Sequence, residues 1–182
     1  MVKFTRIKTN SNGKLAVTNW SATKLIEKIS VDDSKLNVTQ FRSFAIYTTN
    51  SIGQGERWPA QYDHLHNLPS FLPSVEMKID KEGNKIMKAF NGIITLSVDN
   101  ITDAAELEWV KQVASMMPMT LAAFVSSTGR GVKILVRIAP RDGHDITTID
   151  EAEQLCKSAY NIAVRVYDGI INHNVQMAAT AL

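Results

Sequence analysis

The sequence predicts an α+β fold in which an antiparallel sheet carries helices on one face and follows a small N-terminal α/β extension. From residue 92 onward, apolar periodicity gives the order strand, helix, strand, strand, helix, and a fourth strand is expected after the last helix. A β-α-β-β-α-β unit of this kind usually folds as a ferredoxin-like, or RRM-like, sheet. The length of 182 residues and the hydrophobic share of 45% suit a domain with a real core.

Composition narrows the classes of protein to consider. The net charge of +2 is too small to imply a nucleic-acid ligand by itself. Cys156 is the single cysteine, so the chain can form no internal disulfide, and a reducing cytoplasm is the expected compartment. Residues 1–14 lack the apolar core of a signal peptide, and no apolar run approaches the roughly 20 residues of a membrane helix. We therefore expect a cytoplasmic protein without a membrane partner.

Residues 1–84 are expected to form the extension. Weak alternation over residues 2–20, with a turn signal at Asn12-Gly13, predicts a hairpin. Ser21 can cap a short helix that follows the hairpin. Apolar spacing predicts a second helix over residues 33–46.

Residues 48–75 differ from both flanks, because two glycines and three prolines interrupt any regular element. We expect this segment to be irregular, and such long irregular segments are often functional. His64 and His66 lie within it, and we interpret them as surface histidines rather than as a metal-binding pair. Residues 75–79 and 85–90, joined by a turn that contains glycine, predict a hairpin.

The core is expected over residues 85–182 and is expected to be incomplete at its C-terminal end. Asp103 and Glu106 offer its first helix a start that resembles a capping box. Apolar residues then follow at helical spacing. The expected elements are, in order, a strand at 93–99, a helix from Asp103, a strand at 120–126, a turn at 127–131, a strand at 132–138, a helix at 148–167 and a last strand within 175–182.

Strand geometry predicts which side chains gather at one edge of the sheet. A right-handed crossover leaves the third strand antiparallel between the first two, so Asp99 should lie near Lys133. Alternation places the apolar sides of both strands under the helices. The opposite, open face would then display Ser97, Asp99, Lys133 and Arg137 together. Phe124 is either core or a stacking platform for a base, and core is the favoured interpretation.

The turn over residues 127–131 has two interpretations. Its backbone amides could cradle a phosphate while Arg130 adds a charge-assisted contact. Alternatively, it is a hairpin turn in which Gly129 and Gly131 supply a positive φ.

The charged residues near this turn also have alternative roles. Asp99 could be a metal ligand, a cap of the following helix or the ion-pair partner of Lys133. Lys133 and Arg137 could bind a nucleic-acid backbone or belong to a solvated sheet face.

Three segments carry a resemblance that extends from about residue 25 to the end of the chain. They are Asn67-Leu68-Pro69-Ser70, Gly92-Ile93-Ile94-Thr95-Leu96-Ser97-Val98-Asp99-Asn100 and Ala123-Phe124-Val125-Ser126-Ser127-Thr128-Gly129-Arg130-Gly131-Val132-Lys133. On these segments the chain resembles the VirE N-terminal domain family of Bacteroides-type mobile elements, a branch related to the archaeo-eukaryotic primase-polymerase superfamily. The resemblance implies that the ferredoxin-like core is of the primase type.

In primase-polymerases, two acidic residues spaced by one residue close the first strand and hold divalent metal, and a third acid lies on a later strand. Here Ser97 stands at the first acidic position, so Asp99 stands alone, and Lys133 lies where histidine is common. The third acid would lie about where the sequence stops, and Asp168 comes too early for that role. Because hard divalent ions need several oxygen ligands, Mg²⁺ or Mn²⁺ is implied only if other carboxylates join Asp99.

The leading hypothesis is a primase-polymerase-like module of a mobile element that binds nucleic acid or nucleotide phosphate, without a cofactor or catalysis in this form. A helicase- or ATPase-type domain, or a partner chain, would be its further partner. The alternatives are an active primase or nucleotidyltransferase whose remaining acids lie beyond residue 182, and a protein-interaction scaffold without a ligand site. The site residues are Asp99 as the residual acidic position and, as phosphate contacts, Ser127, Gly129, Arg130, Gly131, Lys133 and Arg137.

Overall fold

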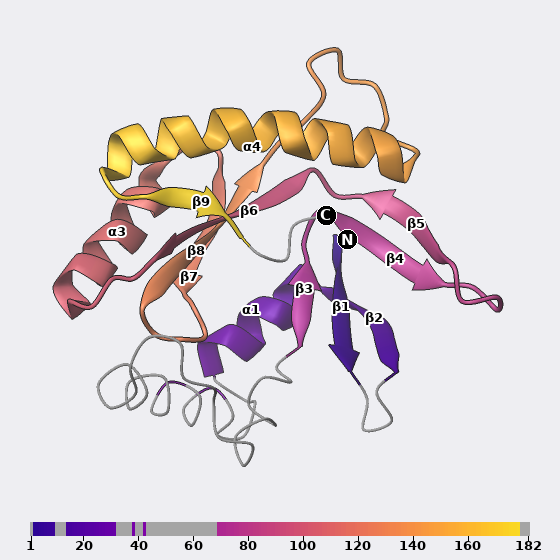
Figure 1. Cartoon of the computed structure of the whole chain (residues 1–182), viewed down its shortest axis with the longest axis horizontal. Helices are drawn as coiled ribbons and strands as arrows, with labels where there is room; N and C mark the ends of the chain where they lie inside the picture. The colour runs from indigo at the N-terminus through magenta and orange to yellow at the C-terminus, as the bar shows by residue number, and fades with distance from the viewer. Residues whose placement is uncertain (1, 10–13, 32–37, 39–41, 43–68, 179–182) are drawn as a thin grey trace, which may run out of the picture.

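The computed structural model describes residues 2–9, 14–31, 38, 42 and 69–178, and this part of the chain has a mixed α+β fold (Figure 1). Its strands form antiparallel sheets with the orders β2-β1-β3, β4-β5 and β7-β8-β6-β9. The elements are β1 (Lys3–Thr9), β2 (Leu15–Ser21), α1 (Ala22–Val31), β3 (Ser70–Leu72), β4 (Val75–Ile79), β5 (Lys85–Phe90), β6 (Ile93–Asp99), α3 (Ala104–Met116), β7 (Thr120–Val125), β8 (Gly131–Arg137), α4 (Ile149–Ile171) and β9 (Val175–Met177).

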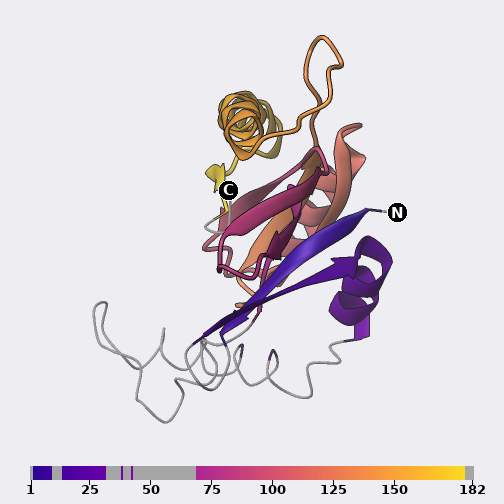
Figure 2. The same cartoon turned by 90° about the vertical axis from the view of Figure 1, so that its right-hand side faces the viewer.

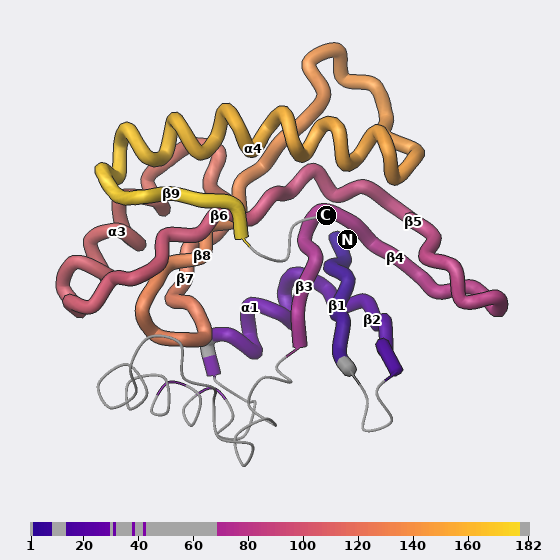
Figure 3. Tube along the Cα trace, in the orientation of Figure 1, coloured from indigo at the N-terminus to yellow at the C-terminus, as the bar shows by residue number. Residues whose placement is uncertain are grey.

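The β7-β8-β6-β9 sheet is the frame of the second half of the chain. Its elements follow in the order β6, α3, β7, β8, α4 and β9, as the sequence predicts. β6 and β8 pair along their whole length, from Ile93 opposite Arg137 to Asp99 opposite Gly131. The predicted adjacency of these two strands is therefore confirmed. β9 lies along the other side of β6, as the tube in Figure 3 shows.

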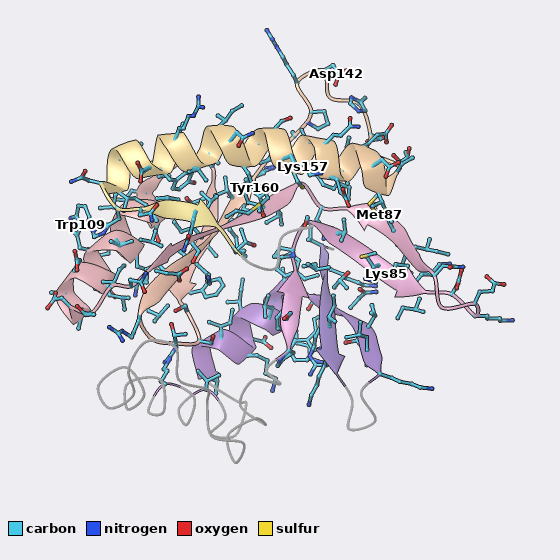
Figure 4. The ribbon with its side chains drawn as sticks, viewed as in Figure 1. Lys85, Met87, Trp109, Asp142, Lys157 and Tyr160 are labelled. Carbon is cyan, nitrogen blue, oxygen red and sulfur yellow. The ribbon has the colours of Figure 1, made fainter. Side chains whose placement is uncertain are left out.

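The helices α3 and α4 pack against one face of this sheet in a single core. Val110 and Ala114 of α3 are fully buried there. Tyr160 of α4 lies between the helix and β6 in Figure 4, and its hydroxyl accepts a hydrogen bond of 3.3 Å from the Thr95 N–H. The strand residues of this core are Ile94, Leu96, Val98, Val132, Ile134 and Val136. The alternation predicted for β6 and β8 is therefore confirmed.

Both helices begin where the sequence predicts, and each has a cap at its start. The Asp103 carboxylate accepts a hydrogen bond of 2.8 Å from the Glu106 N–H at the start of α3. Thr148 and Glu151 form a complete capping box at the start of α4. Each cap satisfies backbone N–H groups that have no partner within their helix.

α4 extends beyond its predicted end at Tyr167. Ile171 is fully buried, so packing continues the helix by one further turn. Asn172 then adopts a left-handed conformation (φ 53°), a common way for a helix to end. α4 has 23 residues, yet neither it nor any other described helix is long and apolar enough to cross a membrane.

The opposite face of the sheet is covered by the N-terminal unit, which consists of β1, β2, α1 and β3 (Figure 2). Phe4 and Leu25 of this unit pack against Ile93 and Leu135 in a second core. The prediction of an open face is therefore wrong for this part of the sheet, because the apolar residues of the extension need a partner surface. Phe124 packs against the same core, which confirms its interpretation as a core residue.

The segment expected to be irregular contains the short strand β3. Its three residues pair with β1, and Phe71 within it packs against the second core. Pro69 and Pro73 flank the strand, which lies at the edge of its sheet, where proline is tolerated. The prediction of irregular structure is therefore wrong for β3. Other predictions fall on residues outside the described ones: the turn at Asn12-Gly13, the pair His64 and His66, and the helix over 33–46 apart from residues 38 and 42.

A buried threonine joins the N-terminal unit to the β4–β5 hairpin. β4 has a bulge between Glu76 and Met77, where the ladder of hydrogen bonds is interrupted. The Thr5 hydroxyl donates to the Val75 carbonyl and accepts from the Met77 N–H, both at 2.8 Å. Thr5 is fully buried, so these two backbone groups are satisfied by its hydroxyl rather than by water.

We expect Thr5→Val to lower the free energy of unfolding by about 2 kcal/mol, because it leaves a buried carbonyl and a buried N–H without partners. Urea unfolding followed by circular dichroism measures the change. The matched control is Thr18→Val on the exposed side of β2, which should cost less than about 0.5 kcal/mol. Equal losses in the two variants would contradict the role given to the Thr5 hydroxyl.

Candidate functional site

Ser97, Asp99 and Lys133 form a hydrogen-bonded group where β6 ends and β8 begins. The strand register places Ser97 directly opposite Lys133. Lys133 Nζ donates to Ser97 Oγ at 2.6 Å, and Ser97 Oγ donates to Asp99 Oδ2 at 2.7 Å. Lys133 Nζ also lies 3.6 Å from Asp99 Oδ1. The predicted proximity of Asp99 and Lys133 is therefore confirmed.

Gln176 of β9 completes this group from the other side of β6. Its Nε2 donates to Asp99 Oδ2 at 2.9 Å, and its backbone pairs with Ser97. The sequence did not reveal this contact, because it depends on the register of a three-residue strand. In the sequence, the indication of this contact was Gln176 itself, a polar residue between the apolar Val175 and Met177. We call Ser97, Asp99, Lys133 and Gln176 the Asp99 group.

The Asp99 group combines one carboxylate with one ammonium, so their charges balance. Ser97 is only 1% exposed, whereas the side chains of Asp99 and Lys133 are 35% and 29% exposed. A solute can therefore reach the charged ends but not the serine hydroxyl. Of the alternatives for Asp99, the ion pair with Lys133 is observed, and the helix-cap role is wrong because Asp103 caps α3.

The Asp99 group does not fit a divalent metal. Mg²⁺ and Mn²⁺ need several oxygen ligands, and Asp99 is the one carboxylate within the Asp99 group. Its Oδ2 already accepts two hydrogen bonds, and the neighbouring Lys133 ammonium opposes a cation. Among all residues that the structure describes, no three His, Cys, Asp or Glu side chains are grouped to hold a metal. Asp168 Oδ1 instead accepts a hydrogen bond of 3.3 Å from the Val175 N–H.

The turn between β7 and β8 is tight and uses its own donors. Ser126 N–H donates to the Gly131 carbonyl at 2.8 Å, and Gly129 N–H donates to the Ser126 carbonyl at 3.0 Å. Arg130 N–H donates to Thr128 Oγ1 at 3.3 Å. Gly129 has the positive φ (73°) expected of a hairpin turn, but the same expectation for Gly131 is wrong. Because the Gly129 and Arg130 amides are engaged, a phosphate would rely on side chains more than on a backbone cradle.

Gly131 is required for a different reason, the close approach of β8 to β6. It lies opposite Asp99, and an added Cβ would lie 2.4 Å from the Val98 carbonyl oxygen and 2.7 Å from Asp99 Oδ1. Carbon atoms do not approach oxygen so closely without displacement. The glycine therefore fixes the spacing between the two strands that hold the Asp99 group.

Two arginines lie at this turn. Arg130 is part of it, and its carbonyl accepts a hydrogen bond of 2.9 Å from the Ile101 N–H. Arg42 donates from Nη2 to the Ser126 carbonyl at 3.2 Å and packs over Gly129. Sequence reasoning missed Arg42, because 84 positions separate it from its partner. The turn is thus a basic region beside the Asp99 group.

Arg137 does not belong to this region. It lies at the opposite end of β8, exposed and in register with Ile93. Four strand positions separate it from Lys133, a distance of about 13 Å. The prediction that Arg137 shares a face with Asp99 and Lys133 is therefore confirmed, but Arg137 is not their neighbour. The residues share a face by alternation but lie at different levels along the strand.

Cys156 offers no nucleophile. It is buried in the core under α4, and burial raises the pKa of its thiol to about 11, with a smaller effect from the Glu153 charge. The thiol is therefore protonated at neutral pH. This confirms its interpretation as a core residue.

Comparison with known proteins gives one match. A family model described as BT4734-like, N-terminal domain, matches residues 63–182, which is more than half of the chain. No curated protein and no solved structure matches the chain. The matched range includes the β7-β8-β6-β9 sheet, the turn and the whole Asp99 group.

Proposed function

The chain belongs to the BT4734-like N-terminal domain family, and from that premise we propose that it is a primase-polymerase-like module of the VirE N-terminal type. In this proposal it binds nucleic acid or nucleotide phosphate for a mobile genetic element and catalyses no reaction by itself. The segments that carry the resemblance, at residues 67–70, 92–100 and 123–133, all lie within the matched range.

The observation that carries the proposal is the position of Lys133. Its side chain is 29% exposed at the edge of the sheet, next to a turn that carries Arg130 and the exposed Ser127. Ammonium, guanidinium and hydroxyl groups are the donors that phosphate oxygens accept most strongly. We assign the phosphate contacts to these three residues, while Gly129 and Gly131 shape the backbone around them.

The absence of catalysis in this proposal rests on Asp99. A two-metal phosphoryl transfer needs converging carboxylates, and the Asp99 carboxylate is neutralised by Lys133. In this role Asp99 holds the lysine in place and competes with an incoming phosphate. We leave Arg137 out of the proposed site because of its distance from Lys133.

The test compares Arg130→Ala/Lys133→Ala with wild type in binding a fluorescent single-stranded oligo(dT) at about 50 and about 200 mM salt. We expect the double variant to bind about fivefold more weakly at low salt. Its salt dependence, as the slope of log K against log salt, should fall by about 1.4, because each lost phosphate contact contributes about 0.7.

The matched control is Arg137→Ala, which removes a cation from the other end of the same strand. It should change the affinity less than about twofold. Circular dichroism checks that all variants keep their fold. An equal loss in Arg137→Ala and in the double variant would overturn the proposed site, and a wild type that binds neither oligonucleotide nor nucleotide would favour a protein-interaction scaffold.

A further inference from the structure

The N-terminal unit carries an excess of positive charge that the proposed site does not use. Residues 1–31 contain six lysines and arginines and one glutamate, although the net charge of the whole chain is only +2. The strands β1 and β2 contain no acidic residue. The charge is therefore concentrated on one small unit, which is a common feature of surfaces that bind polyanions.

The even-numbered face of the β1–β2 hairpin gathers part of this charge around Trp20. The guanidinium carbon of Arg6 lies 4.9 Å from the centre of the Trp20 ring, and Lys24 Nζ from α1 lies 4.6 Å from it. Phe71 packs beside the same ring, with centroids 5.5 Å apart and planes tilted by 59°. Lys8 follows Arg6 on this face by alternation. We call Arg6, Lys8, Trp20 and Lys24 the hairpin patch.

The fold leaves the hairpin patch accessible. The opposite face of the hairpin is closed, because Thr5 is buried against β4. On the even-numbered face, Phe4 is buried by the second core, but Lys8 and Lys24 are exposed and Arg6 and Trp20 are half-buried. The cations therefore border solvent, with an aromatic ring between them.

Two cations of the hairpin patch, Arg6 and Lys24, have the Trp20 ring as a partner. Among the described residues no acidic side chain forms an ion pair with Arg6, Lys8 or Lys24. Arg6 Nε is buried, and no hydrogen-bond partner for it lies in the described part of the chain. Cation–π contact holds the groups in place without neutralising their charge. Their charge is thus available to an anionic ligand.

We infer that the hairpin patch is a binding site for single-stranded nucleic acid, separate from the Asp99 group. The exposed lysines and the Arg6 guanidinium contact the phosphate backbone, and the Trp20 ring beside that guanidinium contacts a base. Single-stranded nucleic acid is the ligand that uses both features, since such sites combine a cationic track with aromatic surfaces. An acidic protein or an anionic membrane would use the charge without placing a base on the ring, and the second test below separates these ligands from single-stranded nucleic acid.

The first test removes charge from the patch and leaves the Trp20 ring in place. Lys8→Gln/Lys24→Gln should bind oligo(dT) about fivefold more weakly than wild type at about 50 mM salt, with a salt slope smaller by about 1.4. The matched control is Lys157→Gln/Arg165→Gln. This variant removes the same number of positive charges from the exposed side of α4, on the other side of the sheet from the hairpin patch. It should change the affinity less than about twofold. Equal effects in the two double variants, or none in either, would overturn the inference.

The second test asks whether a base reaches the aromatic ring. The chain has three tryptophans, so Trp58→Phe/Trp109→Phe leaves Trp20 as the single reporter of fluorescence. Oligo(dT) should quench this fluorescence in a saturable way, and heparin, which has no bases, should not. Binding of heparin or anionic vesicles as tight as that of oligo(dT), with no quenching by any ligand, would replace the inference with a general polyanion or membrane surface.

The two sites can be separated, because each has its own variants. Loss of binding in Lys8→Gln/Lys24→Gln but not in Arg130→Ala/Lys133→Ala would support binding at the hairpin patch. It would contradict the proposed phosphate site around Lys133. The reverse result would support the phosphate site around Lys133 and contradict binding at the hairpin patch. Losses in both would indicate one strand of nucleic acid that contacts both sites.

Discussion

Gly131→Ala is expected to lower the free energy of unfolding by about 3 kcal/mol, a typical upper value for overpacking a core. The new Cβ would lie 2.4 Å from the Val98 carbonyl oxygen and 2.7 Å from Asp99 Oδ1, so β6 and β8 would have to separate. These strands cannot move freely, because Val98 and Val132 are fully buried between the sheet and its helices. The midpoint of urea unfolding, followed by circular dichroism, measures the loss.

The matched control is Gly129→Ala in the same turn. Gly129 has a φ of 73°, so alanine carries the cost of a left-handed conformation, about 1 kcal/mol. Its nearest contact would be the flexible side chain of Arg42 at 3.3 Å, which can move away. The close packing of β8 against β6 would be disproved if Gly131→Ala proved no more destabilising than Gly129→Ala.

Asp99→Asn is expected to increase the affinity for oligo(dT) about tenfold at low salt. The substitution removes a negative charge that lies 3.6 Å from Lys133 Nζ. Two charges at that distance interact by about 1 to 4 kcal/mol between bulk water and a protein surface, and tenfold corresponds to about 1.4 kcal/mol. The asparagine oxygen can still accept from Ser97 and Gln176, so the local structure should persist. Fluorescence anisotropy in EDTA measures the change.

Asp142→Asn is the charge-matched control, since Asp142 lies on the loop that projects above α4 in Figure 4. It should change the affinity less than about twofold. An active metal-dependent nucleotidyltransferase predicts the opposite sign for Asp99→Asn. If this variant binds nucleotide more weakly than wild type in Mg²⁺, and the difference disappears in EDTA, Asp99 is a metal ligand and the non-catalytic proposal is wrong.

The pairing of β6 with β8 and the buried sides of both strands could be predicted, because they follow from local sequence patterns. Alternation in two apolar strands identifies the buried sides, and the right-handed crossover makes the strands neighbours. Together these rules placed Asp99 beside Lys133, as observed. The same rules placed Arg137 on the correct face but did not give its position along the strand. A period of two specifies the face of a residue, whereas its level depends on the register, which only the paired strands determine.

The remaining parts of the site depend on contacts between distant segments. Gln176 reaches Asp99 across 77 positions, and Arg42 reaches Ser126 across 84. Phe4 and Leu25 help to cover the face of the sheet opposite the helices. Their apolar character is evident from the sequence, but the residues against which they pack are not. No local pattern encodes such pairings, because they arise from the packing of whole units.

The register between β6 and β8 has a consequence for binding kinetics. Asp99, Ser97 and Lys133 are all anchored on paired strands whose opposite sides are buried in the helix core. Their backbone positions are therefore preorganised, and a ligand that enters needs to reorient only side-chain ends. For the phosphate ligand proposed above, association should therefore need no rearrangement of the backbone, and differences in affinity between ligands should appear mainly in how long each one stays bound.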